Sequence, residues 1–236
     1  DSTLIVSGYR ESEKINFLTV SKKDYYEKKI VLTEGDDKID LISCGKVSPL
    51  TQLEIIDVDS QLPLPEDAIG EICIASESVS SGYWENDKET EETFFVVRNG
   101  KKLPMLRTGD LGFVHEGELY ITGRKKDLLI INGRNYYPQD IEKIVEGAHE
   151  NIRTGCVAAF SITGDLSEEL VLVAEVKTKP SEIEIEAIRT EVMRHFQLIP
   201  KDIKLLKPRT VLKTTSGKIR RRDMRKSYLE NSLNVH

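Results

Sequence analysis

The sequence of 236 residues has only three cysteines, Cys44, Cys73 and Cys156, which lie far apart and form no CxxC pair. An odd number of widely spaced cysteines argues against a disulfide framework and against a cysteine-rich zinc site. The four histidines are isolated, and HExxH and GxSxG motifs are absent. We therefore expect that the protein is cytoplasmic and that its thiols are reduced. We also expect that this chain forms neither a metal centre nor a site with a serine nucleophile.

The chain also lacks any apolar run that approaches the ~20 residues needed to cross a bilayer, so we expect no membrane span. It begins at Asp1, without an initiator methionine or a signal-peptide pattern, which indicates a piece of a longer protein. The net charge of −6 and the pI of about 5.4 argue against strong nucleic-acid binding.

Charge divides the chain into two halves. Residues 1–122 hold 13 basic against 24 acidic side chains, a net charge of −11, whereas residues 123–236 hold 21 against 16, a net charge of +5. This contrast predicts two domains. The basic half either docks on the acidic half or keeps a basic face for an anionic ligand or partner.

The first half shows short apolar runs separated by breaks rich in glycine, proline and aspartate, a pattern typical of a barrel-like β subdomain. Its expected strands cover residues 4–6, 16–20, 53–58, 70–75, 113–114 and 119–121, with a hairpin turn at 115–118.

The second half predicts a small mixed α+β domain with a three-stranded sheet and helices. Helices are expected at 138–148, from Pro180 onward and at 219–229, strands at 128–131, 156–162, 170–178 and 203–206, and loops at 132–135 and 214–218. The overall fold class is therefore α+β.

Two motifs, RTGD at 107–110 and GRKKD at 123–127, place Asp110 and Arg124 at the two ends of one expected hairpin. A carboxylate can accept both hydroxyls of a ribose, and a guanidinium can reach a ribose oxygen or a phosphate. The alternative is an aspartate in a tight turn that forms a salt bridge with the arginine.

The segment TTSGK at 214–218 resembles a phosphate-binding loop but fails the P-loop template, which requires glycine at Leu212 and serine or threonine at Ile219. A loop rich in hydroxyls that presents Lys218 can still clamp an anion. The alternative is a solvated surface loop.

Seven basic side chains and one acid lie between residues 213 and 226, among them Arg221 and Arg225. This density indicates a solvated helix face, a surface for an acidic protein partner, or a nucleic-acid surface. No aromatic residues interleave with the charges, which disfavours single-strand binding.

Taken together, the order and spacing of these motifs resemble the C-terminal part of an adenylate-forming ligase. The resemblance rests on GEICI at 70–74, SGYW at 81–84, ETF at 92–94, RTGD at 107–110, GRKKD at 123–127 and TSGKIRR at 215–221. Within that superfamily, ISCG at 42–45 and GRNYYPQDIE at 133–142 resemble fatty acyl-AMP ligases, since acyl-CoA synthetases usually carry glutamate in place of Arg134. LIVSG at 4–8 resembles the stretch that follows the family's Mg-ATP motif.

The resemblance implies a two-step reaction in which ATP and a fatty acid give acyl-AMP, and the acyl group then passes to the phosphopantetheine thiol of an acyl carrier protein. By position, Asp110 holds the ribose hydroxyls, Arg124 the ribose or a phosphate, and Lys218 the carboxylate and α-phosphate oxygens. Lys126 is the hinge residue on which the small domain turns between the two steps. The implied parts are 1–123 of the large domain, a hinge at 124–127 and a small domain at 128–236.

The same resemblance implies that Gly133, Arg134 and Asn135 line the route of the thiol, and that Arg221 and Arg225 contact the carrier protein. The ATP phosphate loop, the glutamate that binds Mg²⁺ and most of the acyl pocket are expected upstream of Asp1, so we expect the 236-residue chain alone to be inactive. Leu212 departs from the proline of many relatives. Two alternatives stay open: an acyl-CoA synthetase that transfers to CoA, and a non-catalytic relative that binds acyl-adenylate.

Overall fold

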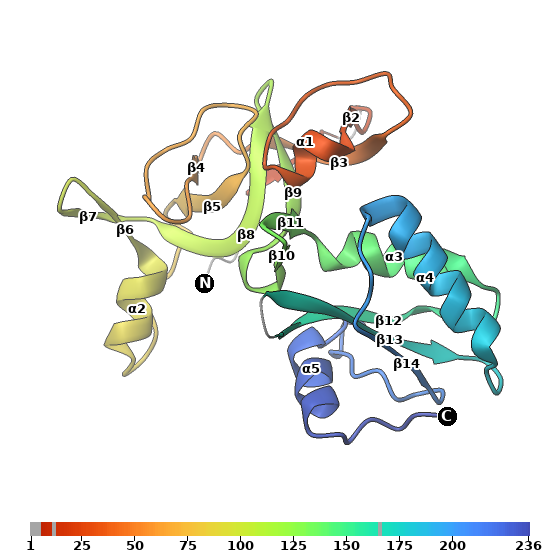
Figure 1. The fold of residues 1–236 in the computed structure, drawn as a ribbon. Coiled ribbons are helices and arrows are strands. Elements are labelled where there is room, and N and C mark those ends of the chain that lie inside the picture. The colour runs from red at the N-terminus through yellow and green to blue at the C-terminus, as the bar shows by residue number, and fades with distance from the viewer. Residues whose placement is uncertain (1–5, 11–12, 165–166) are drawn as a thin grey trace. The chain divides into compact units, whose positions relative to one another are not determined.

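The computed structural model describes residues 6–10, 13–164 and 167–236 (Figure 1). The strand expected at 4–6 therefore lies outside the described residues, apart from residue 6. The chain forms two compact units, Asp1–Lys126 (unit 1) and Asp127–His236 (unit 2). The boundary falls inside the segment 124–127 for which the sequence predicts a hinge; that the segment moves stays a prediction.

Unit 1 is built on a curled antiparallel sheet of seven strands in the order β1-β3-β9-β8-β5-β4, with β2 paired to β3. This confirms the expected β subdomain. The strands of the sheet are β1 (Ser7–Gly8), β2 (Phe17–Ser21), β3 (Lys38–Val47), β4 (Gln52–Ile56), β5 (Gly70–Ala75), β8 (Leu106–His115) and β9 (Glu118–Arg124).

Strands β8 and β9 form the expected hairpin around a turn at Glu116 and Gly117, which both adopt positive φ. A two-residue turn in which both residues have positive φ has a backbone twist that matches the twist of the two strands it connects. Further along the hairpin, Gly112 is required because a Cβ there would lie 2.3 Å from the carbonyl oxygen of Tyr120. The hairpin brings the RTGD and GRKKD motifs onto neighbouring strands.

Five elements of unit 1 were not predicted from the sequence. They are strand β3, helices α1 (Lys22–Tyr26) and α2 (Asp87–Phe94), and the separate hairpin of β6 (Phe95–Arg98) and β7 (Lys101–Pro104). Helix α2 is strongly charged. The Asn86 side chain caps its N-terminus by accepting from the backbone N–H of Glu89, and Phe94, its last residue, is buried. Phe94 packs in the core of the sheet with Ile55, Ile72 and Leu106.

Unit 2 is a three-stranded mixed sheet of β12 (Ile152–Thr163), β13 (Glu168–Val176) and β14 (Asp202–Leu206), in which β12 and β13 are antiparallel and β13 and β14 parallel. Helices α3 (Pro138–Ala148) and α4 (Glu182–Phe196) lie on one side of this sheet and α5 (Arg221–Leu229) on the other (Figure 1). A short hairpin of β10 (Leu129–Ile131) and β11 (Arg134–Tyr136) precedes α3. The α+β fold class is thereby confirmed.

Two helix starts differ from the expectation. Helix α4 begins at Glu182 rather than Pro180, because Ser181 caps it and forms a reciprocal capping box with Glu184. Helix α5 begins at Arg221 rather than residue 219, because Ile219 pairs with Lys213 in an isolated β-bridge. That bridge closes the base of the loop that carries Lys218.

Candidate functional site

Asp110 and Arg124 lie directly opposite each other on β8 and β9, at the end of the hairpin away from its turn. Arg124 Nε donates to Asp110 Oδ1 over 3.0 Å. The Asp110 side chain is 33% exposed and the Arg124 side chain 68%, so both are accessible to a ligand in solvent. An exposed pair of this kind contributes little to stability, typically ~0–1 kcal/mol, which leaves the two groups available to bind.

Beside this pair lies a buried carboxylate that sequence analysis did not single out. Glu71, the second residue of β5, accepts from Arg107 Nη2 over 2.6 Å and from Lys125 Nζ over 3.3 Å, and its side chain is only 4% exposed. The available signal was a charged residue within the apolar run GEICI, since buried acids are rare unless paired. On the same strand, burial raises the pKa of the Cys73 thiol to about 12, so Cys73 is a core residue and no nucleophile.

Lys218 is exposed at the end of a tight loop whose shape is set by its own backbone and hydroxyl groups. Thr214 N–H donates to the carbonyl of Lys218 over 2.8 Å, and Lys218 N–H donates to Thr214 Oγ1 over 3.1 Å. Gly217 adopts a φ of +83°, which favours glycine. The loop therefore presents an ammonium group from an ordered base.

The segment before this loop is held by Glu175, an almost fully buried acid on β13. Its Oε1 accepts from the backbone N–H groups of Thr210 and Val211, both over 2.7 Å, and Arg153 pairs with its other oxygen. Burial works to raise the pKa of Glu175, but these N–H groups and the Arg153 charge lower it below its usual value. Leu212, where many relatives carry proline, uses its N–H to contact Met224 Sδ at 3.2 Å, a contact that proline cannot make.

Gly133 lies in the two-residue turn Asn132-Gly133 between β10 and β11, and both turn residues have positive φ. Arg134 and Asn135 follow in β11, where Arg134 is exposed and Asn135 half-buried. The three residues expected to line a thiol route thus share one hairpin of unit 2. Their role stays a prediction.

Comparisons with known proteins agree with these motifs. The chain is 35% identical over 243 residues to the medium-chain fatty acid–acyl-carrier-protein ligase JamA of Moorena producens, and 34% identical over 271 residues to the long-chain fatty acid–AMP ligase FadD32 of Mycolicibacterium smegmatis. Each alignment covers 99% of this chain. A solved structure from work on fatty acyl-adenylate ligases of E. coli and L. pneumophila matches 97% of this chain with a TM-score of 0.82 and 32% identity.

The chain belongs to the adenylate-forming ligase superfamily. The family model for the AMP domain of Disco-interacting protein 2-like proteins matches residues 126–236, which is unit 2 with one preceding residue. The chain spans 41% of JamA and 43% of FadD32, and 40% of the matched fatty acyl-adenylate ligase structure. The resemblance to fatty acyl-AMP ligases drawn from the motifs is confirmed.

Within this superfamily member, Arg221 has an intramolecular role that sequence analysis missed. Its Nε and Nη2 donate to the two oxygens of Glu142 over 2.7 and 2.6 Å, and its Nη1 donates to Asp127 over 3.0 Å. Burial works to lower the pKa of Arg221, but the hydrogen bond and charge of Glu142, followed by those of Asp127, raise it. Arg225 donates from Nε to the carbonyl of Ser161 over 2.8 Å. That either arginine binds a partner stays a prediction; Arg222 and Lys226 are the exposed cations of α5.

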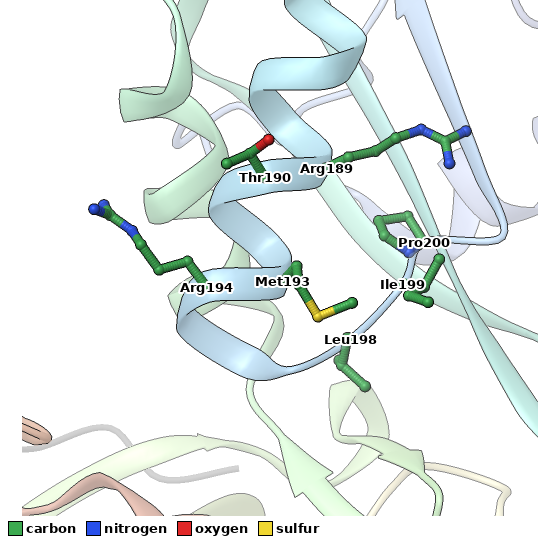
Figure 2. A pocket seen from close by; sticks show the side chains of 7 residues that line it. All are labelled: Arg189, Thr190, Met193, Arg194, Leu198, Ile199 and Pro200. Carbon is green, nitrogen blue, oxygen red and sulfur yellow. The ribbon is translucent and has the colours of Figure 1, made fainter.

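Figure 2 shows a pocket of ≈ 450 Å³ in unit 2, between α4 and the segment that follows it. Its lining includes the apolar side chains of Met193, Leu198 and Ile199, and also Arg189 and Arg194, which extend to opposite sides of the helix. Each arginine is paired on the same helix, with Glu186 and Glu191. The pocket therefore has no unbalanced charge that would select a ligand.

Metal ligands do not gather in the part of the chain that the structure describes: no group of three or more histidine, cysteine, aspartate or glutamate side chains is placed to hold an ion. The described residues therefore do not fit a Mg²⁺ site. Among the same described residues, no helix has both the length and the apolar character needed to cross a bilayer.

Proposed function

We propose that the protein containing this chain is a fatty acyl-AMP ligase that loads an acyl carrier protein. In the first step a carboxylate oxygen of the fatty acid forms a bond to the α-phosphorus of ATP, and pyrophosphate leaves. In the second step the sulfur of a phosphopantetheine thiol forms a bond to the acyl carbon, AMP leaves with the bonding electron pair, and the thiol proton passes to solvent.

The observation that carries the proposal is the open pair of Asp110 and Arg124 in a chain that aligns over nearly its full length with fatty acid-adenylating ligases. Asp110 uses one carboxylate oxygen toward Arg124 and is one third exposed, which suits acceptance of two vicinal hydroxyls. Arg124 is two thirds exposed and supplies a planar donor group for a ribose oxygen or phosphate. Together they recognise the ribose of a nucleotide.

Lys218 supplies the positive charge that adenylation requires. Negative charge grows on the α-phosphate oxygens as the carboxylate attacks, and a preorganised cation stabilises that charge more than the ground state. The ordered base of the loop limits the entropy lost when the ammonium group engages, while its exposure allows it to withdraw before the thiol arrives. Because the two units move relative to each other in this proposal, Lys218 acts in the first step only.

Three observations support the choice of a carrier protein as acceptor. JamA, at 35% identity, is named for transfer to an acyl carrier protein, and Arg134 stands where acyl-CoA synthetases usually have glutamate. The exposed cations Arg222 and Lys226 of α5 offer a surface for an acidic helix of such a carrier. Reversing both to glutamate should slow transfer of the acyl group from acyl-AMP to the carrier-bound thiol and weaken the salt dependence of that transfer, with CoA-dependent transfer as the control.

The experiment that tests the function separates the two half-reactions in the full-length protein. Acyl-AMP formation is followed by release of pyrophosphate, and transfer is followed by mass spectrometry with preformed acyl-AMP and either holo-carrier protein or CoA. Lys218→Ala should slow adenylation by ~10²-fold or more and leave transfer unchanged. Lys201→Ala, which removes another exposed lysine of unit 2, is the matched control.

Three results contradict parts of the proposal. Equal losses in both half-reactions would make Lys218 structural or shared. Transfer to CoA in preference to the carrier would identify an acyl-CoA synthetase. No acyl-AMP from the unaltered protein with any fatty acid would indicate a relative that binds acyl-adenylate without forming it. The cytoplasmic location remains a prediction alongside these.

A further inference from the structure

We infer that Lys125 and Asp127 are anchors, each tied to the buried framework of its own unit, and that together they confine the hinge to Lys126. The inference rests on the proposed function insofar as it assumes that unit 2 changes orientation between the two steps. It assigns positioning roles to Glu71, Lys125, Asp127 and Arg221, none of which needs to touch the substrate.

The anchor in unit 1 joins Lys125 to the central sheet. Lys125 Nζ reaches Glu71 Oε2 over 3.3 Å, and the same oxygen accepts from Arg107 over 2.6 Å. Glu71 belongs to β5, whose residues 70–74 are all buried, so its position is determined by the packing of the sheet. A charged hydrogen bond to a nearly buried carboxylate is stronger than one at the surface. Residue 125 therefore moves with unit 1.

The anchor in unit 2 joins Asp127 to two helices. Asp127 Oδ2 accepts from Arg221 of α5 over 3.0 Å, and Arg221 is held by both oxygens of Glu142 of α3. Glu142 also accepts from the backbone N–H of Ala159 in β12 over 3.0 Å. Each member of this network is half-buried or buried. Residue 127 therefore moves with unit 2.

Only one residue lies between the two anchors. Lys126 is exposed, it is the last residue of unit 1, and it lies in the 3₁₀ turn Lys125–Asp127. A change of orientation must then be absorbed by the backbone dihedrals around Lys126, since the residues on either side are tied down. A hinge usually consists of a few residues that take up large φ/ψ changes. Here the two ion pairs hold residues 125 and 127, which leaves Lys126 as the hinge residue.

The inference predicts a specific rescue. Lys126→Pro fixes φ near −65° and removes an N–H group, so it should block transfer to the carrier while acyl-AMP still forms. Adding Lys125→Met releases the unit 1 anchor but leaves Glu71 paired with Arg107, and the backbone of residue 125 can then take up the rotation. The double variant should transfer at least about tenfold faster than Lys126→Pro alone, the usual scale for one hydrogen bond to a charged group. Lys102→Met, which breaks a surface pair with Glu91, is the matched control and should give no rescue.

A second measurement needs no ligase activity. Hydrogen exchange of the amides in residues 124–128 should rise about tenfold in Lys125→Met and in Asp127→Asn, because each change frees one side of the hinge. Asp202→Asn, which removes a paired carboxylate elsewhere in unit 2, should leave this segment unchanged. If hydrogen exchange at residues 124–128 rises as expected but the protein forms no acyl-AMP, the proposed function is refuted and the assignment of Lys125 and Asp127 as anchors still holds. No rescue together with unchanged exchange, or a rise spread evenly over a whole unit, would overturn the anchors.

Discussion

Replacing Arg221 with methionine removes the guanidinium group that pairs with Glu142 and Asp127, while an apolar side chain of similar length remains. The guanidinium makes three hydrogen bonds, two to Glu142 and one to Asp127. Methionine preserves apolar packing of similar length, so the loss is mainly electrostatic. Glu142 is left as a carboxylate with a side chain only 7% exposed and no cationic partner at Arg221's place.

The size of the effect follows from that burial. Removing one partner of a fully buried pair costs ~3–5 kcal/mol, because the remaining charge stays desolvated. The Arg221 side chain is 20% exposed, so solvent screens part of this, and we expect ~2–4 kcal/mol. For a unit of about 110 residues, 1 kcal/mol corresponds to roughly 4–8 °C, which gives a fall in the melting temperature of unit 2 of roughly 8–32 °C.

The assay follows unit 2 within the whole chain. Hydrogen exchange at the core amides of β13 reports the free energy of opening of this unit, and thermal unfolding reports its midpoint. Arg220→Met is the matched control, since Arg220 pairs with Asp223 at the surface, with side chains 50% and 41% exposed. That control should change the free energy of unfolding by less than ~0.5 kcal/mol.

A second substitution tests whether the loss of stability in Arg221→Met comes from the unpaired charge of Glu142. Glu142→Gln in the Arg221→Met background removes the buried charge but keeps an oxygen that can accept from the Ala159 N–H. The double variant should recover at least about half of the lost free energy. A loss no larger than that of Arg220→Met, or no recovery in the double variant, refutes the reasoning and returns Arg221 to the set of cations available to a partner.

Three further outcomes are expected. Asp110→Ala should raise the KM for ATP more than it lowers kcat, because a ribose contact is present in both ground and transition states, and an unchanged KM with only a lower melting temperature would speak for a purely structural pair. Gly133→Ala should destabilise the β10–β11 turn by ~1–2 kcal/mol, as expected for a φ of +75°, and should slow transfer while adenylation continues; equal loss in both steps would count against a thiol route there. The Asn151 hydrogen bond, followed by the Ser181 N–H, lowers the pKa of Glu184 from 4.5 to about 2, so its stabilisation is present above pH 4.5 and lost as the pH falls towards about 2. The stability difference between wild type and Glu184→Ala in urea unfolding should shrink over that range, and a difference independent of pH would be incompatible with this assignment.

The sequence by itself determined the elements whose signals are local. Helix α3 runs over the expected residues because Pro138 suits a first helical position and the apolar residues that follow share one face. The β8–β9 hairpin was predictable because Glu116 and Gly117 form a turn between two apolar runs. The motifs on that hairpin and around Lys218 were sufficient for the superfamily, which the comparisons then confirmed.

Tertiary structure decided the elements and roles that depend on distant partners. Strand β3 has no continuous apolar run, and its place follows from pairing with β1, β2 and β9. The sequence shows Arg221 as one cation in a dense cluster, but its partner Glu142 lies 79 residues earlier and reaches it only when α3 and α5 pack on β12. Glu71 likewise meets Lys125 across 54 residues. Local patterns encode turns, caps and periodicity, whereas the pairing of buried charges depends on which strands and helices the folded core brings together.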